Sequence, residues 1–507
     1  MSDKQLKKIV IVGGGTAGWM SAALLSKFMS GSGASITLIE SEQIGTIGVG
    51  EATIPHIQNF NNMLDIDETT FLKETGATYK LGIEFADWGE LGERYLHPFG
   101  EYGIPMGELQ FHHYWTRMKH SGSPYPIGDY CLNVVAAKAG KFMHPVQDQT
   151  SLAARIPYAY HLDATRYAQF LRRYAEDRKA RRIEGKVVET ALDSETGHIQ
   201  NVKLESGETI EGEFFIDCSG FRGVLIEGAL KAGYEDWSHL LPMDRAVTVH
   251  SKVIEPPKPY TIATAKDAGW TWRIPLQTRV GNGYVYSSKF IDKETATDVL
   301  LNGLDSEAIT EPRHLAFTTG RRKTFWKGNC LALGLSTGFL EPLESTSIHL
   351  IQEGLIRLVA LMPDKRFNPA NEIEYNRVMG LTYERIRDFI LLHYVVTRRV
   401  DTPFWRYIQN LDIPQVMAHR MKLLAESGHY VSYEHDLFKL DSWLAVMEGQ
   451  GMAPQTFSPI AEMLSADDIN NTMGQLRYAI SEITRQMPTH GKYIQHVVGR
   501  SEYKLSD

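Results

Sequence analysis

The sequence predicts a mixed α/β fold, with a strand, a glycine-rich turn and a helix at the N-terminus and a mostly helical C-terminal region. A short β-branched segment, Lys8–Val12, has the composition of a buried strand and runs directly into the turn. Two later segments, 212–220 and 328–334, also read as strands that end in small residues. Near the C-terminus, apolar residues follow helical spacing over 350–361 and 383–394.

The composition is that of a globular protein and narrows the possible partners. Hydrophobic residues make up 43% of the 507 residues and charged residues 22%, so the chain can bury a large core. A net charge of −8 argues against binding to nucleic acid or to an anionic membrane surface. The three cysteines form no CxxC pair, and the first apolar run, 9–12, is too short for a signal peptide. We therefore expect a cytoplasmic protein without a metal site.

The N-terminal turn carries a dinucleotide-binding pattern. It reads Gly-Gly-Gly-Thr-Ala-Gly and fits G-x-G-x-x-G. Gly13 permits the tight turn, Gly15 lets the backbone approach a pyrophosphate, and Gly18 lets the helix pack closely on the strand. The helix N-terminus, with Thr16 and Ala17, faces the phosphate charge.

The segments that follow the turn complete this pattern. We expect an apolar helix over 17–29 and a second strand over 35–39. Glu40 ends that strand, 22 positions after Gly18, where a carboxylate that binds a ribose is expected. The alternative is a glycine-rich turn without a ligand.

Two distant segments favour FAD over NAD as the dinucleotide. Residues 212–220 read as a strand leading into a small-residue turn. Residues 328–334 contain a G-(D/N)-x-x-A pattern, which flavin monooxygenase folds use to close over the ribityl chain. Three separated segments that return to one sheet are typical of an FAD-binding monooxygenase-like fold.

Five further segments carry unusual residue combinations. They are Gly-Val-Gly-Glu-Ala-Thr-Ile-Pro at 48–55, Thr-Tyr-Lys-Leu-Gly-Ile at 78–83, His-Pro-Phe-Gly at 97–100, Trp-Thr-Trp-Arg-Ile-Pro at 270–275 and Phe-Leu-Glu-Pro-Leu-Glu-Ser-Thr-Ser-Ile at 339–348. Together with the N-terminal turn, they resemble the flavin-dependent halogenases, whose best-known members act on tryptophan. The resemblance covers most of the chain.

The segment 48–55 resembles the strap that links the flavin and halide sites of that family. Its glycines would let the backbone lie against the isoalloxazine ring. A plain glycine-rich loop is the alternative. The candidate cofactor-binding residues outside the N-terminal turn are Glu40, Gly50, Glu51, Ala52, Val187, Leu335 and Ile348.

The lysine of the second segment matches the essential catalytic residue of the family. Lys80 lies in the alternating pattern of Tyr79, Leu81, Ile83 and Phe85, which predicts a half-buried strand. Most lysines are solvated surface groups. A lysine drawn into an apolar site can instead act as a positioned acid or as an amine of lowered pKa.

The fifth segment is similar to the family pattern E-P-L-E-S-T-G-I. The resemblance makes Glu344 the carboxylate paired with Lys80, and Thr346 and Ser347 the residues whose backbone N–H groups bind the halide. Ser347 stands where the family has glycine, which leaves the halide geometry and the preference for chloride or bromide open. Helix capping by the Ser-Thr-Ser run is the alternative role of this segment.

The double-tryptophan segment is the most specific of the five. Trp270 and Trp272 are spaced to share one face of a strand, with Pro275 at its end. The pair could be core packing. The resemblance instead assigns it to the wall behind the flavin.

Candidate substrate-binding residues come from several segments. The resemblance names His97, Phe99, Glu344 and Trp443. Tryptophan-specific members carry paired tyrosines and a glutamate just before the segment of Trp443, and residues 430–436 do not match that pattern securely. A simpler or larger indole, or another phenol-like or pyrrole-like ring, therefore fits equally well.

The resemblance implies a halogenase that uses FADH2, dioxygen and bromide or chloride to halogenate an electron-rich aromatic ring such as indole. Hypohalous acid would form near the halide site and reach the substrate through Lys80, by hydrogen bonding or as a haloamine. No second dinucleotide pattern is visible, so a separate flavin reductase would supply FADH2. We expect an FAD-binding part over 1–350, a substrate-covering helical part over 351–507 and, by analogy, a homodimer. The alternatives are a single-component flavin aromatic hydroxylase and a non-catalytic FAD-binding protein.

Overall fold

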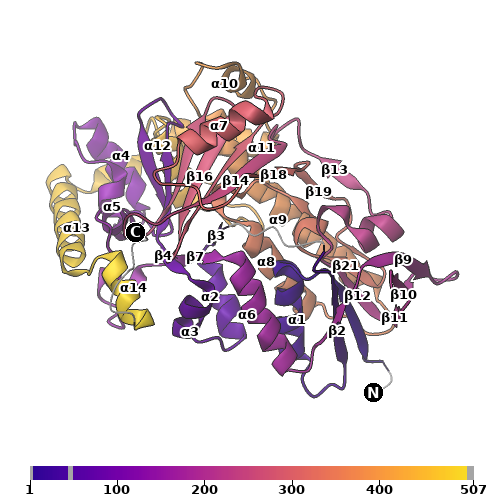
Figure 1. Cartoon of the computed structure of the whole chain (residues 1–507). Coiled ribbons are helices and arrows are strands. Elements are labelled where there is room, and N and C mark those ends of the chain that lie inside the picture. Colours follow the sequence, from indigo (N-terminus) through magenta and orange to yellow (C-terminus); the bar gives the residue numbers. More distant parts are fainter. Residues whose placement is uncertain (1–3, 44–49, 500–507) are drawn as a thin grey trace. The chain divides into compact units, whose positions relative to one another are not determined.

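The computed structural model describes residues 4–43 and 50–499, which fold as two compact units (Figure 1). Unit 1 comprises Met1–Ala77, Leu162–Ser238 and Ala316–Glu384, and unit 2 comprises Thr78–His161, His239–Leu315 and Arg385–Asp507. With 40% helix and 21% strand, the fold class is mixed α/β, as predicted. The predicted boundary at residue 350 separates an FAD-binding part from a substrate-covering part, and it stays a prediction.

Unit 1 is built on a six-stranded sheet in the order β20–β21–β12–β1–β2–β8. Val12, Ile39 and Asp217 lie in register on three neighbouring parallel strands, so the carboxyl ends of these strands meet at one edge. Ligands of open α/β sheets bind at such an edge. The strands are β1 (Lys8–Val12), β2 (Ser35–Glu40), β8 (Arg181–Glu184), β12 (Phe214–Asp217), β20 (Trp326–Lys327) and β21 (Cys330–Ala332).

One face of this sheet packs against a smaller sheet. Val10 and Val12 share a buried cluster with Val202 and Leu204 of the three-stranded sheet β9–β11. The other strands of unit 1 are β3 (Gly50–Ala52), β9 (Val187–Leu192), β10 (Ile199–Leu204), β11 (Thr209–Glu211), β13 (Tyr234–Asp236), β19 (Gly320–Arg322) and β22 (Gly338–Phe339).

The helices of unit 1 include those that the sequence predicts. The helix expected over 17–29 is α1, and the one expected over 350–361 begins earlier, at Ser347, as α8. The segment 383–394 lies inside α9, which continues into unit 2. The helices are α1 (Thr16–Phe28), α2 (His56–Met63), α3 (Glu68–Thr75), α6 (Ala164–Asp177), α8 (Ser347–Ala360) and α9 (Pro369–Val395), with the shorter turns η3 (Gly220–Arg222), η4 (Val224–Ala229), η5 (Gly334–Ser336) and η6 (Pro342–Glu344).

Unit 2 is built on a seven-stranded sheet in the order β18–β14–β17–β16–β15–β5–β6. Its β15 is parallel to β5, whereas β16 pairs antiparallel with both of its neighbours. The strands of the unit are β4 (Thr78–Lys80), β5 (Gly82–Ala86), β6 (Arg94–Pro98), β7 (Ala159–Asp163), β14 (Arg245–Ser251), β15 (Thr261–Lys266), β16 (Gly269–Pro275), β17 (Val280–Tyr286) and β18 (Arg313–Ala316).

Helices pack onto this sheet, as the cluster of Val247, Tyr284 and Leu300 shows for α7. The helices of unit 2 are α4 (Phe111–His120), α5 (Leu132–Lys138), α7 (Lys293–Asn302), α10 (Pro403–Ile408), α11 (Gln415–Ser427), α12 (Leu440–Gly449), α13 (Ala466–Gln486) and α14 (His490–Val498), with the turns η1 (Ile127–Tyr130), η2 (Leu152–Arg155) and η7 (Pro459–Met463).

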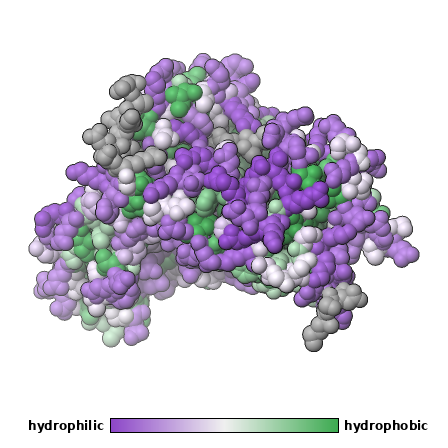
Figure 2. All heavy atoms as spheres, turned by 60° about the horizontal axis from the view of Figure 1, so that its bottom comes forward, coloured by the Kyte–Doolittle hydropathy of each residue, from purple (hydrophilic) through white to green (hydrophobic). Residues whose placement is uncertain are grey.

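The surface carries hydrophobic residues only in small groups on the face drawn in Figure 2, where hydrophilic residues predominate. Among residues 4–43 and 50–499, no helix combines the length and apolar character needed to cross a bilayer.

A close backbone approach inside the unit 2 sheet gives a stability prediction. Gly283 on β17 faces Trp272 on β16, and a Cβ there would lie 2.1 Å from the indole ring. We expect Gly283→Ala to lower the free energy of unfolding by about 1–3 kcal/mol, because the ring must move. Gly474→Ala in α13 is the control, since a Cβ there meets nothing within 4 Å. A melting temperature of Gly283→Ala equal to that of the wild type would contradict this.

Candidate functional site

The glycines of the unit 1 turn have two different surroundings. Gly13 and Gly18 lie against other backbone atoms, whereas Gly15 borders open space. Gly13 has a φ of +114°, and a Cβ there would lie 2.2 Å from the carbonyl oxygen of Cys218. At Gly18 a Cβ would lie 1.8 Å from the Gly13 oxygen. At Gly15 a Cβ would meet nothing within 4 Å. The turn therefore has the shape that lets a backbone approach a pyrophosphate at the start of α1.

The carboxylate of Glu40 is held at the end of β2. Arg182 donates a hydrogen bond to it, and the Trp19 indole N–H lies 3.3 Å from its second oxygen. Arg172 adds a charge contact at 3.6 Å. These donors orient the carboxylate at the edge where a ribose hydroxyl would bind.

The structure brings both distant flavin-type segments to the glycine turn. The turn after β12 meets Gly13 through the carbonyl of Cys218. In the other segment, Gly334 starts η5, and a Cβ there would lie 2.7 Å from that of Ala17. Leu335 lies in the same turn. Val187 begins β9 and packs, partly buried, against the core cluster of this region.

Asp217 and Asn329 fix these segments through hydrogen bonds that the motifs do not predict. Asp217 is fully buried and accepts hydrogen bonds from the backbone N–H groups of Leu225 and Ile226 and from the Ser336 hydroxyl. Asn329 bonds to both backbone groups of Ile199. Asp217 lies in the segment 212–220, and Asn329 is the (D/N) position of the pattern in 328–334. Their roles were missed because the partners are distant in sequence.

The strap segment is described only in part. Gly48 and Val49 lie outside the described residues, whereas Gly50, Glu51 and Ala52 form β3. Burial raises the pKa of the Glu51 carboxyl to about 7. A carboxyl that takes up a proton so readily is a candidate for hydrogen bonding to a bound ligand in its neutral form.

The start of α8 has the properties of an anion site. Thr346 is the N-cap residue, but its side chain makes no capping bond, and among the described residues its buried hydroxyl has no partner. The expected capping role is therefore absent at Thr346. Ser345 adopts a φ of 60°, whereas Ser347 begins the helix without a positive φ, so a serine fits where the family has glycine. Glu344 and Ile348, on either side, are buried.

Lys80 in unit 2 has no exposed surface. Its ammonium nitrogen lies 5.1 Å from the centre of the Phe99 ring, within the range of a cation–π interaction. The expectation of one half-buried strand is wrong, because the chain breaks into β4 and β5 at Leu81. The Leu81 N–H donates to Pro259, and its carbonyl accepts from the Phe99 N–H, so the segment is covered on both sides.

The predicted substrate residues of unit 2 lie around two aromatic rings that the sequence analysis did not single out. Phe389 of α9 and Phe438 stack with ring centres 4.0 Å apart. His97 lies 5.5 Å from the first ring and 6.0 Å from the second, and Trp443 of α12 lies 6.0 Å from the first. The helical pattern of 383–394 indicated a buried face but did not mark Phe389 as part of a site.

The buried Arg420 binds two residues of the segment 430–436, which does not match the pattern of tryptophan-specific enzymes. Arg420 of α11 forms an ion pair of 2.6 Å with Asp436, and both are almost fully buried. Its guanidinium lies 4.7 Å from the ring centres of Trp443 and Tyr433. An isolated arginine in a helix carries no local signal, so its role was not predicted.

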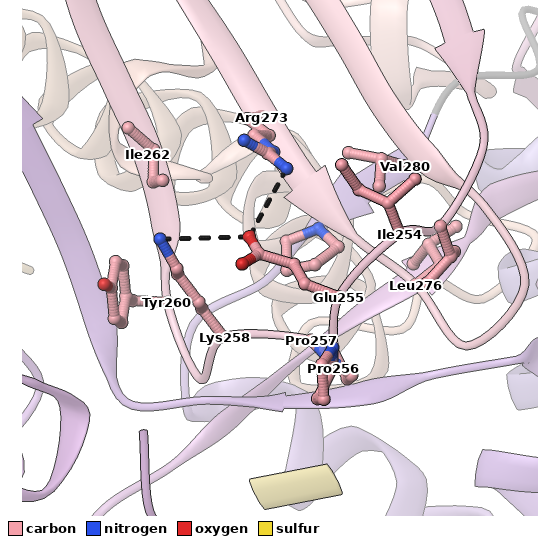
Figure 3. A pocket seen from close by; sticks show the side chains of 12 residues that line it. Ile254, Glu255, Pro256, Pro257, Lys258, Tyr260, Ile262, Arg273, Leu276 and Val280 are labelled. Atoms are coloured by element: carbon pink, nitrogen blue, oxygen red, sulfur yellow. Dashed lines mark hydrogen bonds and ion pairs between the residues drawn. The ribbon is translucent and has the colours of Figure 1, made fainter. Parts of the chain in front are cut away.

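The double-tryptophan strand has different surroundings on its two faces. Trp270 and Trp272 lie close together, with ring centres 6.0 Å apart, as the spacing predicts. Arg273, on the alternate face, lines a pocket with Glu255 and Lys258 (Figure 3). Glu255 pairs with both cations at 3.5 and 3.9 Å. Pro275 is the one predicted site residue among those that line this pocket.

The predicted residues thus fall into two sets. Unit 1 holds the nucleotide-binding residues together with Glu344, Thr346 and Ser347, and unit 2 holds Lys80, the aromatic substrate residues and the double-tryptophan strand. One set suits anions and a dinucleotide, and the other suits an aromatic ring beside a buried amine.

Comparison with known proteins decides the family. A family model described as tryptophan halogenase matches residues 8–466. The chain belongs to the tryptophan halogenase family. Tryptophan 6-halogenase SttH of Streptomyces toxytricini is 36% identical over 480 residues, covering 89% of this chain and 90% of that protein. Tryptophan 7-halogenase RebH of Lentzea aerocolonigenes is 32% identical and covers 99% of this chain and 100% of RebH.

A solved structure agrees. BrvH, a flavin-dependent halogenase from Brevundimonas sp. BAL3, has a TM-score of 0.94 at 40% identity, covering 98% of this chain and 100% of BrvH. The halogenase described here is therefore a flavin-dependent oxidoreductase, and its cofactor is FAD, reduced to FADH2 by a separate flavin reductase. The open Gly15, the oriented Glu40 and the edge of parallel strands fit that cofactor.

The turn geometry yields a binding prediction. We expect Gly15→Val to fold in the absence of flavin with a free energy of unfolding lowered by only about 1 kcal/mol, because its Cβ meets no protein atom although valine is a poorer N-cap residue than glycine. The same side chain would occupy the space of the pyrophosphate, so FAD affinity should fall by about 10-fold or more. Flavin fluorescence titration measures this. An affinity equal to that of the wild type would contradict the role of Gly15.

The raised pKa of Glu51 yields a pH prediction. The folded protein binds this proton more tightly than the unfolded chain does, so its stabilising effect is present below about pH 4.5 and is lost as pH rises through 7. We expect Glu51→Gln, which cannot ionise, to gain stability over the wild type as pH rises from 5 to 8, by about 2 kcal/mol. Melting curves of the flavin-free proteins test this, and a difference independent of pH would contradict it.

Proposed function

We propose that this halogenase uses bromide or chloride to halogenate an electron-rich aromatic ring such as an indole, with Lys80 as the catalytic residue. The supporting observation is a lysine without exposed surface, 5.1 Å from the ring of Phe99. Surface lysines do not meet this description, and a buried amine needs a reason to be retained. The relatives named as tryptophan halogenases support an indole as the ring.

The halide is assigned to the first turn of α8. The N–H groups that begin a helix attract an anion, and the Thr346 side chain leaves this turn uncapped. Ser347 adopts a helical backbone there, so its amide can take part despite the missing glycine. We leave bromide and chloride as equal candidates.

The bound and reduced FAD supplies the two electrons with which dioxygen and a halide ion yield hypohalous acid and water. The chain's own residues then control the product. Lys80 holds the hypohalous acid by hydrogen bonding, or carries its halogen as a haloamine, inside a covered site that excludes water. His97, Phe99 and Trp443 offer flat surfaces that orient the ring, and Glu344 accepts the ring proton.

The lysine role is tested by removing the amine while keeping the length of the side chain. We expect Lys80→Met to lower the yield of halogenated indole by at least about 100-fold, because no group then directs the oxidant. The purified enzyme, FAD, flavin reductase, NADH, indole and bromide or chloride are combined, and the halogen isotope pattern is read by mass spectrometry. Lys258→Met, a more exposed lysine of the same unit, is the control. Hydroxylated indole without halogen would overturn the proposal.

A further inference from the structure

The strand that carries Lys80 is fixed by two buried histidines from distant parts of unit 2. His161 contacts Thr78, two residues before the lysine, and His490 contacts Tyr79, the residue next to it. On the other side, the Leu81 N–H donates to Pro259 at 2.7 Å. The neighbours of Lys80 on both sides are therefore tied to other segments.

The hydrogen bonds of His161 define which of its nitrogens carries the proton. The Pro275 carbonyl can only accept, so the Thr78 hydroxyl donates to it at 2.7 Å. That hydroxyl then accepts from Nδ1–H of His161, 3.0 Å away. The other nitrogen, Nε2, lies 2.9 Å from the Thr261 hydroxyl and accepts from it in the neutral ring that burial favours. His161 thus links β4 to β15, and the Thr78 hydroxyl adds the link to the end of β16.

His490 is defined in the same way. The Tyr79 backbone N–H can only donate, and it lies 3.1 Å from Nε2 of His490. Nδ1–H donates to the Pro257 carbonyl at 2.7 Å. Both ring nitrogens are therefore used, and the ring is 1% exposed. A protonated ring could not accept the Tyr79 bond.

The surroundings explain why both rings stay neutral. Burial lowers the pKa of His490 to about 4. Burial also lowers the pKa of His161 well below its usual value, and the charge of Lys80 lowers it further. The two histidines therefore stay neutral and keep their hydrogen bonds near neutral pH.

His490 also connects the last described helix to this strand. It is the first residue of α14, and its backbone N–H donates to Gly140 at 2.9 Å. The ring of Tyr79 stacks on Phe142 with centres 4.1 Å apart, so the start of α14 and β4 share one aromatic cluster. Neighbouring side chains alternate along a strand, so Tyr79 faces this cluster while Lys80 faces Phe99.

We propose that His161 and His490 are positioning residues for Lys80, and that α14 thereby contributes to halogenation although it follows the segment matched by the family model. This proposal rests on the proposed role of Lys80. The two rings hold the backbone on the N-terminal side of the lysine, and Pro259 holds it on the other side. A shift of about 1 Å at a reacting group can cost about 100-fold in rate.

The test replaces His490 and measures two products separately. His490→Leu removes both side-chain bonds, and we expect kcat for indole halogenation to fall about 10- to 100-fold with KM changed less than about 2-fold. Free hypohalous acid, trapped by a 1,3-diketone, should form at the wild-type rate, because its formation does not use Lys80. FAD affinity should also be unchanged.

The control removes a different bond of α14. Tyr493→Phe deletes the 2.7 Å bond between the Tyr493 hydroxyl and Nδ1 of His144 but keeps the ring and both His490 bonds. We expect it to halogenate indole at close to the wild-type rate. Equal losses in Tyr493→Phe and His490→Leu would mean that α14 acts only by stabilising the fold, and would overturn the proposal.

A conservative variant covers the case in which His490→Leu does not fold. Asn at this position keeps an N–H donor near that of Nδ1 and loses the acceptor for Tyr79. His490→Asn should retain an intermediate kcat, and wild-type kcat would overturn the proposal. Lys80→Met, run in parallel, keeps the two hypotheses apart. If Lys80→Met remains active, the proposed function fails; if it is inactive while both His490 variants match the wild type, only the positioning role fails.

Discussion

The burial of one ammonium group is the constraint on which the organisation of unit 2 depends. Taking a charged amine out of water is costly unless it is paired or hydrogen-bonded. Lys80 meets the ring of Phe99, and its backbone neighbours are bound to Pro259 and to the two buried histidines. These bonds fix the strand, and the fixed strand holds the Lys80 amine in one environment.

Unit 1 differs from unit 2 in how it is suited to charge. It offers backbone N–H groups to a negatively charged ligand, whereas unit 2 buries a positively charged side chain. The start of α1 follows a turn in which Gly13 and Gly18 permit close packing and Gly15 leaves space. The start of α8 is left without a side-chain cap at Thr346. Helix starts attract anions without requiring any buried ion, so the start of α8 suits the halide that we propose for it, as the start of α1 suits the dinucleotide.

Local signals explain what the sequence could predict. The turn after β1, the helices α1 and α8 and the pairing of Trp270 with Trp272 all follow from residues adjacent in sequence or spaced by one structural period. The burial of Lys80 was underestimated because alternation over 79–85 describes one strand, whereas the chain turns at Leu81 to bond with Pro259. The alternation of apolar residues cannot by itself show that a segment is covered on both sides.

The residues that were missed share a different property. His490 lies 411 positions from Tyr79, and Phe438 lies far from His97 in sequence although their rings are 6.0 Å apart. Single histidines and phenylalanines are common in cores, and nothing nearby in the sequence distinguishes these. Only the three-dimensional pairing gives them a role. The family resemblance could not supply it either, because it carries over matched motifs and these residues lie outside them.

The path of the chain explains why strand β4, which carries Lys80, needs hydrogen bonds to several other segments. The chain passes from unit 1 to unit 2 between Ala77 and Thr78 and returns between His161 and Leu162. Strands β4 and β7, which pair through Lys80 and Ala159, are therefore two of the segments at which the two units are covalently joined. A strand at such a junction is continuous with the chain of both units. The bonds of Thr78 and His161 to β15 and β16 commit it to unit 2, so the amine keeps its place beside the aromatic rings that would hold the substrate.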